Sequence, residues 1–334
     1  MNLAAKFFKQ VVALLAIALV CTGCGGYLAS TSSNPWQPVS VPTTSTLLDL
    51  SFAKNPQHGW LVGTGSTLLE TSDGGQTWQE RQLDLDQTYR FSSVSFSGDE
   101  GWVAGQPSIL LHTTDGGKSW ARVPLSAKLP GAPNTVVALG AQAAEMTTDI
   151  GAIYRTADGG RTWKAMVEEA VGVIRNIARS ADGKYVAVSS RGNFYSTWEP
   201  GQAAWEPHNR NSSRRLQNMG FAPDGRLWML ARGGQIQFND LQDPETWSDP
   251  VNPEFATSWG LLDLAYRTPN EVWVAGGSGN LLRSQDGGLT WEKDRGVEDV
   301  PSNLYRILFF GENKGFIIGQ NGTLLRYDDT VAAT

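Results

Sequence analysis

The hydrophobic pattern of this chain repeats with a period of roughly 42 residues. Seven tryptophans mark the repeat, separated by 42, 42, 43, 42, 42 and 44 residues: Trp36, Trp78, Trp120, Trp163, Trp205, Trp247 and Trp291. Between them lie short runs in which apolar and polar residues alternate, divided by glycine-rich segments, as in short antiparallel strands. A repeat of this length with several strands per unit is typical of a β-propeller.

Four strands are predicted in each repeat. In the unit 50–83, the first three are 50–52, 59–63 and 67–71, and the fourth begins at Trp78. The last unit, 303–327, has only three such runs, whereas Trp36–Val41 has the spacing of a fourth strand with no strand before it. The N-terminal strand is therefore predicted to complete the last blade. The result is an all-β ring of seven four-stranded antiparallel blades without a free sheet edge.

A second aromatic series falls on the second strand of the units. Large aromatic side chains at a fixed place in each blade supply the apolar area with which one blade packs on the next. Its members are Trp60, Trp102, Tyr185, Trp228, Trp273 and Phe316.

Four of the repeat tryptophans close an octapeptide of the form Thr-Ser-Asp-Gly-Gly-Gln-Thr-Trp, which resembles the Asp-box of sialidases and other propellers. Each aspartate is predicted to accept backbone N–H bonds across a turn, where the Gly-Gly pair permits left-handed conformation. One carboxylate per box disfavours calcium, which takes several oxygen ligands. Two further boxes, at 198–205 and 239–247, keep the tryptophan and lose the turn, which also favours a structural role. The aspartates are Asp73, Asp115, Asp158 and Asp286.

The N-terminal segment has the pattern of an export signal. Lys6 and Lys9 precede an apolar run at 11–20, which is shorter than the ~20 residues of a spanning helix. The following Cys21-Thr-Gly-Cys24 resembles a bacterial lipobox, although Cys21 stands where leucine is usual. We expect a signal peptide at 1–23, a linker at 24–34 anchored by lipid on Cys24, the propeller at 35–328 and a tail at 329–334. An ordinary signal peptide cut nearby is the alternative.

Charge and motif content disfavour several function classes. The net charge is −6, or −8 without Lys6 and Lys9, and an acidic exported protein is a poor candidate for nucleic-acid binding. The three histidines lie in different units without metal-ligand spacing, and no phosphate loop or nucleophile elbow occurs. No catalytic residue, metal or cofactor is therefore predicted. If Cys24 is acylated, the mature chain has no free thiol and no disulfide.

Basic residues concentrate in the middle of this acidic chain. The window 171–235 holds nine basic and four acidic residues, and eight of the nine are arginine. In a blade, the connections before the first strand and after the second lie on one face. Five arginines of two consecutive units are therefore predicted to share that face, whereas Arg179 lies inside a strand. The five are Arg175, Arg191, Arg214, Arg215 and Arg232.

This arginine group predicts a docking surface. Arginine binds carboxylates in bidentate fashion, and gathered like charges repel unless an acidic partner offsets them. A chance group of solvated cations is the alternative. An enzymatic alternative is a sialidase-like glycosidase, which needs arginines, a tyrosine and acidic partners at the mouth of the ring. Tyr305 and Arg306 could reach that mouth, but no acid–base pair lies beside them, and sialidases usually have six blades.

The lipobox, the seven repeats, the Asp-boxes and the arginine group together resemble the photosystem II assembly and stability factors of cyanobacteria and chloroplasts. The resemblance spans the expected mature chain. It implies a non-enzymatic, lipid-anchored protein on the lumenal side of the thylakoid membrane. It also implies binding to the precursor of a reaction-centre subunit and to early assembly complexes. An exported glycan-binding propeller and an envelope scaffold are the alternatives. The implied binding residues are Arg175, Arg179, Arg191, Arg214, Arg215 and Arg232.

Overall fold

The computed structural model describes residues 34–167, 171–210, 212–254, 260–297 and 299–328. The expected signal peptide, Cys24, the linker up to residue 33 and the tail 329–334 lie outside these residues. The stretch Trp36–Asp328 forms one compact unit. Among the described residues, no helix has the length and apolar character needed to cross a membrane.

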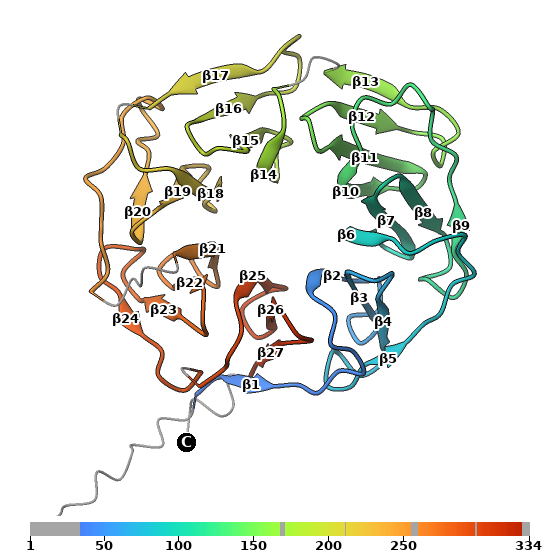
Figure 1. The fold of residues 1–334 in the computed structure, drawn as a ribbon, viewed down its shortest axis with the longest axis horizontal. Helices are drawn as coiled ribbons and strands as arrows, with labels where there is room; N and C mark the ends of the chain where they lie inside the picture. Colours follow the sequence, from blue (N-terminus) through green and yellow to red (C-terminus); the bar gives the residue numbers. More distant parts are fainter. Residues whose placement is uncertain (1–33, 168–170, 211, 255–259, 298, 329–334) are drawn as a thin grey trace, which may run out of the picture. The chain divides into compact units, whose positions relative to one another are not determined.

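Seven antiparallel sheets follow one another around a central axis, with the first strand of each nearest the centre (Figure 1). We number the blades in chain order. Blade 1 contains β2 (Leu47–Phe52), β3 (Gly59–Gly63), β4 (Leu68–Thr71) and β5 (Gln79–Glu80). Blade 2 contains β6 (Arg90–Ser97), β7 (Glu100–Gln106), β8 (Ile109–Thr113) and β9 (Ala121–Arg122). Blade 3 contains β10 (Pro133–Gly140), β11 (Ala143–Thr148), β12 (Ile153–Thr156) and β13 (Lys164–Val167).

The second half of the ring continues this plan. Blade 4 contains β14 (Ile174–Arg179), β15 (Tyr185–Ser189), β16 (Phe194–Trp198) and β17 (Glu206–Asn209). Blade 5 contains β18 (Leu216–Phe221), β19 (Leu227–Ala231) and β20 (Gln235–Phe238). Blade 6 contains β21 (Leu261–Tyr266), β22 (Val272–Gly276), β23 (Leu281–Ser284) and β24 (Glu292–Lys293). Blade 7 contains β25 (Leu304–Phe309), β26 (Gly315–Gly319), β27 (Leu324–Tyr327) and β1 (Trp36–Pro38).

The N-terminal strand closes the ring, as predicted. β1 pairs antiparallel with β27, in a register that sets Trp36 opposite Tyr327 and Pro38 opposite Leu325. Trp36 is 2% exposed, and its ring lies 5.2 Å from that of Tyr327 and 5.5 Å from that of Trp273 in blade 6. The first strand of the propeller therefore fills the core between its last two blades.

Blade 5 departs from the predicted four strands. In the part of this segment that the structure describes, up to residue 254, two isolated bridges replace the fourth strand: Asn239 to Trp247 and Ile236 to Val251. This is one of the two repeats whose box lost its turn, and the segment after Asn239 instead closes a local turn, in which Asp240 N donates to Thr246 O at 2.9 Å. Among the described residues the other six blades have four strands.

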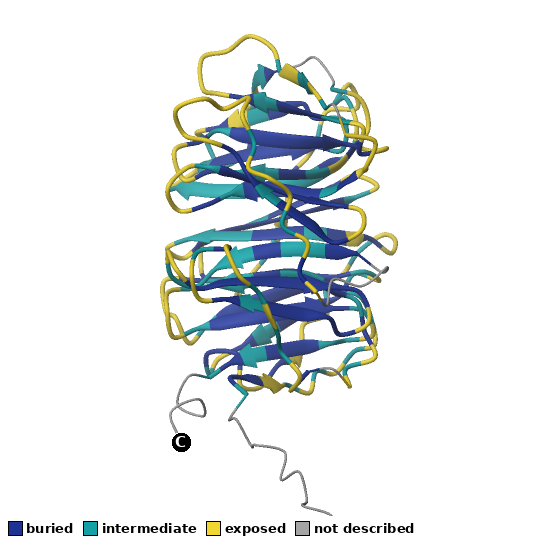
Figure 2. Cartoon of the chain, turned by 90° about the vertical axis from the view of Figure 1, so that its left-hand side faces the viewer, coloured by how far each residue is buried: buried dark blue, intermediate teal, exposed yellow. Residues whose placement is uncertain are grey.

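Burial follows the interfaces between blades. In the edge-on view, buried strands fill the middle of the disc and exposed residues lie mainly in the loops of its two faces (Figure 2). The strand aromatics predicted to pack between blades are all buried, and Trp60 and Trp102 are fully so. Trp60 packs on the second glycine of the next blade's box, where a Cβ on Gly117 would lie 2.4 Å from its ring. Gly117 also has φ +94°, so this position requires glycine for two reasons.

Each innermost strand carries a β-bulge near its start, a feature absent from the sequence prediction. The register shifts at the same place in all seven blades, for example between Ile174 and Asn176 in β14. A bulge re-aims side chains and increases local twist. The seven extra residues are Leu48, Ser92, Asn134, Arg175, Gln217, Leu262 and Tyr305.

The residue after each bulge is polar, and most of these residues tie one blade to the next. Asp49 accepts from Val94 N of blade 2 at 3.0 Å, and Asp263 of blade 6 accepts from Ile307 N of blade 7 at 2.9 Å. The ring closes on an ion pair between Arg306 of blade 7 and Asp49 of blade 1, at 2.7 Å. These bonds satisfy polar groups that would be costly to leave unpaired in the channel wall.

Candidate functional site

The two turns that carry Arg191 and Arg232 lie on one face of the disc. The turn after β15 contacts the segment before β14, because Ser190 N donates to Val173 O at 2.9 Å. The turn after β19 contacts the segment before β18 in the same way, through Arg232 N and Arg215 O at 2.9 Å. A third bond joins the two blades, from Leu216 N to Gly192 O at 2.9 Å. The backbone thus brings the segments with Arg175, Arg191, Arg214, Arg215 and Arg232 together, and we call this surface the arginine face.

Side-chain bonds hold part of the arginine face in place. Arg175 Nε and Nη2 donate to Ser190 O at 3.2 and 3.0 Å, and its Nη1 donates to the Gln217 side chain of blade 5. Arg214 Nη1 lies 3.5 Å from Arg232 O. All five arginines are exposed, and among the described residues none of them forms an ion pair with a carboxylate.

The positive charges of the arginine face repel one another. Partial burial, followed by the charges of Arg232 and Arg215, lowers the pKa of the Arg175 guanidinium. The neighbouring arginines therefore act on one another as like charges, and no acidic side chain in the described part of the chain offsets them. A surface of this kind attracts carboxylates and discriminates against cations.

Arg179 does not belong to the arginine face. It ends β14, at the opposite end of the strand from Arg175, and its Nε donates to Glu145 of blade 3 at 2.7 Å. Its side chain is only 18% exposed, and Tyr185 OH shares the same Glu145 oxygen at 2.9 Å. Arg179 therefore joins blades 3 and 4 and lies away from the arginine face, unlike the position that the family resemblance implied for it.

The four Asp-boxes lie on the other face, where they contact the turn between the first two strands of their blade. Gly116 N, for example, donates to Asp99 O at 2.8 Å. The box carboxylates are fully engaged within the turn. Asp158 accepts from Thr162 N at 2.9 Å, from Thr162 Oγ1 at 2.6 Å and from Thr156 Oγ1 at 2.9 Å. Asp73, Asp115 and Asp286 accept equivalent bonds.

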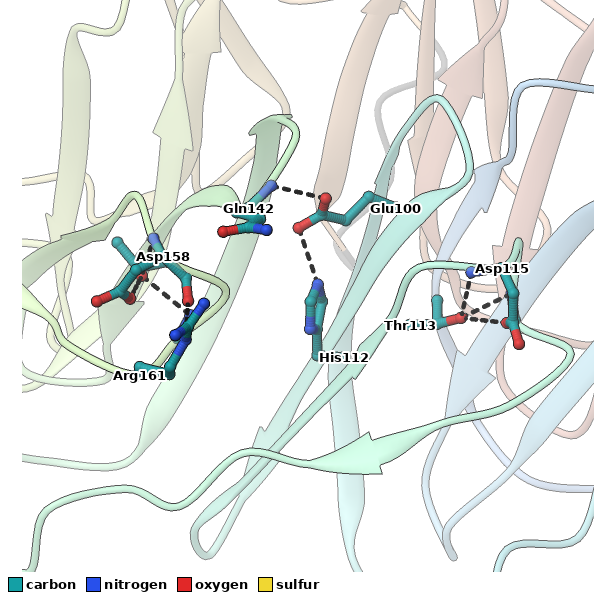
Figure 3. Close-up of polar contacts among 10 residues, drawn as sticks. Glu100, His112, Thr113, Asp115, Gln142, Asp158 and Arg161 are labelled. Carbon is teal, nitrogen blue, oxygen red and sulfur yellow. Dashed lines mark hydrogen bonds and ion pairs between the residues drawn. The ribbon is translucent and has the colours of Figure 1, made fainter.

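The region between blades 2 and 3 near this face contains a buried glutamate (Figure 3). Glu100 Oε1 lies 2.8 Å from His112 Nε2, and its Oε2 accepts from Gln142 N of blade 3 at 2.7 Å. His112 also stacks on Trp102, with ring centroids 3.9 Å apart. His58 and His208 lie in other blades, each beside a glutamate of its own. Among the described residues, no group of His, Cys, Asp or Glu has the geometry of a metal site.

The box carboxylates predict a stability change in acid. The hydrogen bonds from Thr162 and Thr290 lower the pKa of Asp158 and of Asp286 to about 2. A carboxylate with a depressed folded-state pKa stabilises the fold above its unfolded pKa, near 3.9, and loses this contribution as pH falls towards 2. We expect the melting temperature to fall across that window. Asp158→Asn should show a shallower fall, measured by thermal unfolding from pH 5 to 2. If the melting temperatures of Asp158→Asn and the wild type fall in parallel with pH, this role is contradicted. Asp249→Asn, at an exposed position outside the boxes, is the control.

The channel along the ring axis contains a tyrosine, an arginine and carboxylates, the residue types that a sialidase-like active site requires. Tyr305, Arg306, Asp49 and Asp263 all line it. However, Asp49 is paired with Arg306, and Asp263 accepts from Ile307 N and from Asn218 Nδ2 at 3.1 Å. Both carboxylates thus connect blades.

Comparison with known proteins agrees with this architecture. Residues 28–328 match the family model described as photosynthesis system II assembly factor YCF48. The photosystem II assembly lipoprotein Ycf48 of Trichormus variabilis is 63% identical over 330 residues, which cover 98% of this chain and 97% of the relative. Ycf48 of Synechocystis sp. is 61% identical over 96% of this chain and 94% of its own.

Solved structures give the same result. A structure of YCF48 bound to D1 peptide superposes with a TM-score of 0.86 at 60% identity, and the match covers 88% of this chain and 97% of that chain. YCF48 from Cyanidioschyzon merolae superposes with a TM-score of 0.83 at 44% identity, over 89% of this chain and 99% of that chain. On this evidence, the chain belongs to the Ycf48 family of photosystem II assembly factors.

Proposed function

We propose that this protein is a non-enzymatic assembly and stability factor that binds the precursor of the D1 reaction-centre subunit through its arginine face. In this proposal it acts on the lumenal side of the thylakoid membrane, where lipid on Cys24 anchors it, and joins early assembly complexes. The binding residues are Arg175, Arg191, Arg214, Arg215 and Arg232.

The observation that carries the proposal is the uncompensated charge of the arginine face. Five exposed arginines from two neighbouring blades have no carboxylate partner among the described residues, although the chain as a whole has net charge −6. The D1 peptide held by a relative of 60% identity supports a polypeptide as the partner. The use of the channel carboxylates as blade connectors supports a role in binding and not in hydrolysis.

The expected tether is long enough for this arrangement. Trp36 pairs with Tyr327, the last residue of a third strand, so the chain reaches the propeller on the Asp-box face. The linker 24–34 could extend at most about 40 Å. A six-residue strand such as β14 spans only about 20 Å. The fully extended length of the linker therefore exceeds the length of a blade strand.

The proposal is tested by the salt dependence of peptide binding. We expect a fluorescently labelled D1 peptide to bind the soluble domain, residues 35–328, and its Kd to rise at least about tenfold between 50 and 500 mM NaCl, because exposed charge pairs are screened. Fluorescence anisotropy measures this directly. A Kd that is independent of salt would contradict binding by the arginine face.

A further inference from the structure

The central channel opens on the arginine face through the ring of bulged side chains. The channel has a volume of ≈ 490 Å³, within the range of small-ligand pockets, and five of the seven bulged residues line it. Arg175 belongs both to this ring and to the arginine face, so the channel mouth and the docking surface are continuous. The five bulged residues that line the channel are Leu48, Ser92, Asn134, Arg175 and Tyr305.

The mouth has two chemically different arcs. The bulged residues of blades 2 to 5 are polar or cationic: Ser92, Asn134, Arg175 and Gln217. Those of blades 6, 7 and 1 are Leu262, Tyr305 and Leu48, which are apolar or aromatic. A ligand that fits both arcs carries a negative group on one side and an apolar group on the other.

The polar arc presents donors that the fold leaves available. Arg90, at the start of β6, lines the channel and is exposed, and its side chain has no hydrogen bond or ion pair among the described residues. The same holds for the side-chain amide of Asn134. Ser92 Oγ donates to Asn134 O at 2.6 Å, which fixes the two bulges relative to each other. Arg175 uses three of its five N–H bonds internally and so has two for a ligand.

Deeper in the channel, the charged groups already have partners within the fold. Asp49 and Asp263 follow their bulges by one residue and line the wall below the mouth. Arg306 neutralises Asp49, whereas Asp263 accepts hydrogen bonds from Ile307 N and Asn218. Arg179 also lines the channel and is paired with Glu145. The available donors therefore lie at the mouth, on Arg90, Asn134 and Arg175.

We propose that this mouth is a binding subsite for a polypeptide carboxylate that lies next to an apolar side chain. The carboxylate contacts Arg90, Asn134 and Arg175, and the apolar side chain contacts Leu48 and Tyr305. The subsite extends the proposed function by specifying which chemical groups of the partner are bound. It rests on the proposed function only for the identity of the bound polypeptide. A free chain terminus and an acidic side chain supply the same group.

N-acetyl-leucine tests the subsite without any D1 sequence. We expect saturation-transfer NMR on residues 35–328 to show binding in the millimolar range, and N-acetyl-leucinamide to bind at least about tenfold more weakly because it lacks the charge. Arg90→Ala and Asn134→Ala should each weaken N-acetyl-leucine binding about fivefold, and Arg161→Ala on the Asp-box face should not. Equal binding of acid and amide, or no effect of either channel variant, would overturn the subsite.

The D1 peptide then distinguishes the two sources of the carboxylate. One form carries a C-terminal amide and another has its acidic side chains replaced by amides. The form whose affinity no longer responds to Arg90→Ala identifies the group that occupies the mouth. An unmodified peptide that binds with the same affinity to the wild type and to Arg90→Ala would overturn the subsite as a site for a polypeptide carboxylate. If N-acetyl-leucine binds and the D1 peptide does not, the subsite stands and the proposed D1 function fails.

Discussion

Reversing Arg214 and Arg215 to glutamate is expected to weaken D1-peptide binding at least about 100-fold, because attraction to carboxylates is replaced by repulsion. Both side chains are exposed and lie where the segments of blades 4 and 5 meet. Fluorescence anisotropy at about 0.1 M salt measures the loss. The melting temperature should stay within about 2 °C, since exposed substitutions rarely change the free energy of unfolding by more than about 0.5 kcal/mol.

The matched control places the same charge change on the opposite face. Lys118 and Arg161 are exposed and belong to the Asp-box turns of blades 2 and 3. The double variant K118E/R161E alters the net charge as much as R214E/R215E does. We expect it to retain binding within about twofold, because long-range effects are largely screened beyond ~10 Å at 0.1 M salt. Equal losses in the two variants would mean that overall charge, and not the arginine face, governs the affinity.

Trp36→Ala is expected to destabilise the propeller by about 3–5 kcal/mol, the range for removing a fully buried tryptophan. Trp36 is 2% exposed and packs against Trp273, Tyr327 and Phe309 at the junction of blades 6 and 7. The melting temperature should fall by on the order of 10 °C in a protein of this size. Denaturant unfolding gives the free energy directly.

Trp247→Ala is the control for ring closure. Trp247 holds the equivalent place in blade 5, where the fourth strand is reduced to isolated bridges, and it is only partly buried. We expect less than half the destabilisation seen for Trp36→Ala, because less apolar area is lost. Similar losses at the two sites would argue against a special contribution of the N-terminal strand to closure.

Most of the fold is predictable because each repeat is marked by large aromatic residues at constant spacing. The spacing of the tryptophans gave seven blades, and the lone Trp36 segment before the first unit gave the closing strand. β3, Gly59–Gly63, coincides with the predicted run 59–63, and β4, Leu68–Thr71, begins one residue after the start of the predicted run 67–71. The first strand of blade 1 is longer than the predicted 50–52, because β2 begins at Leu47 and the bulge at Leu48 interrupts the alternation.

The features that were missed depend on contacts between blades. The bulged positions carry leucine, serine, asparagine, arginine, glutamine and tyrosine, so no common residue type marks them in the sequence. Arg179 stood among the expected binding residues only through the family resemblance. Its ion pair with Glu145, which lies 34 residues earlier in another blade, has no sign in the sequence. The lost box turn does not mark the weakened fourth strand of blade 5, because blade 4 lost its box turn as well and still forms β17.

Arginine side-chain NMR during a D1-peptide titration tests the central claim most directly. With the Nε–H resonances assigned, the peptide should shift those of Arg175, Arg191, Arg214, Arg215 and Arg232, and leave Arg161 and Arg179 in place. Shifts confined to the Asp-box face, or an unchanged set of these five resonances with the peptide bound, would contradict a docking surface shared by blades 4 and 5.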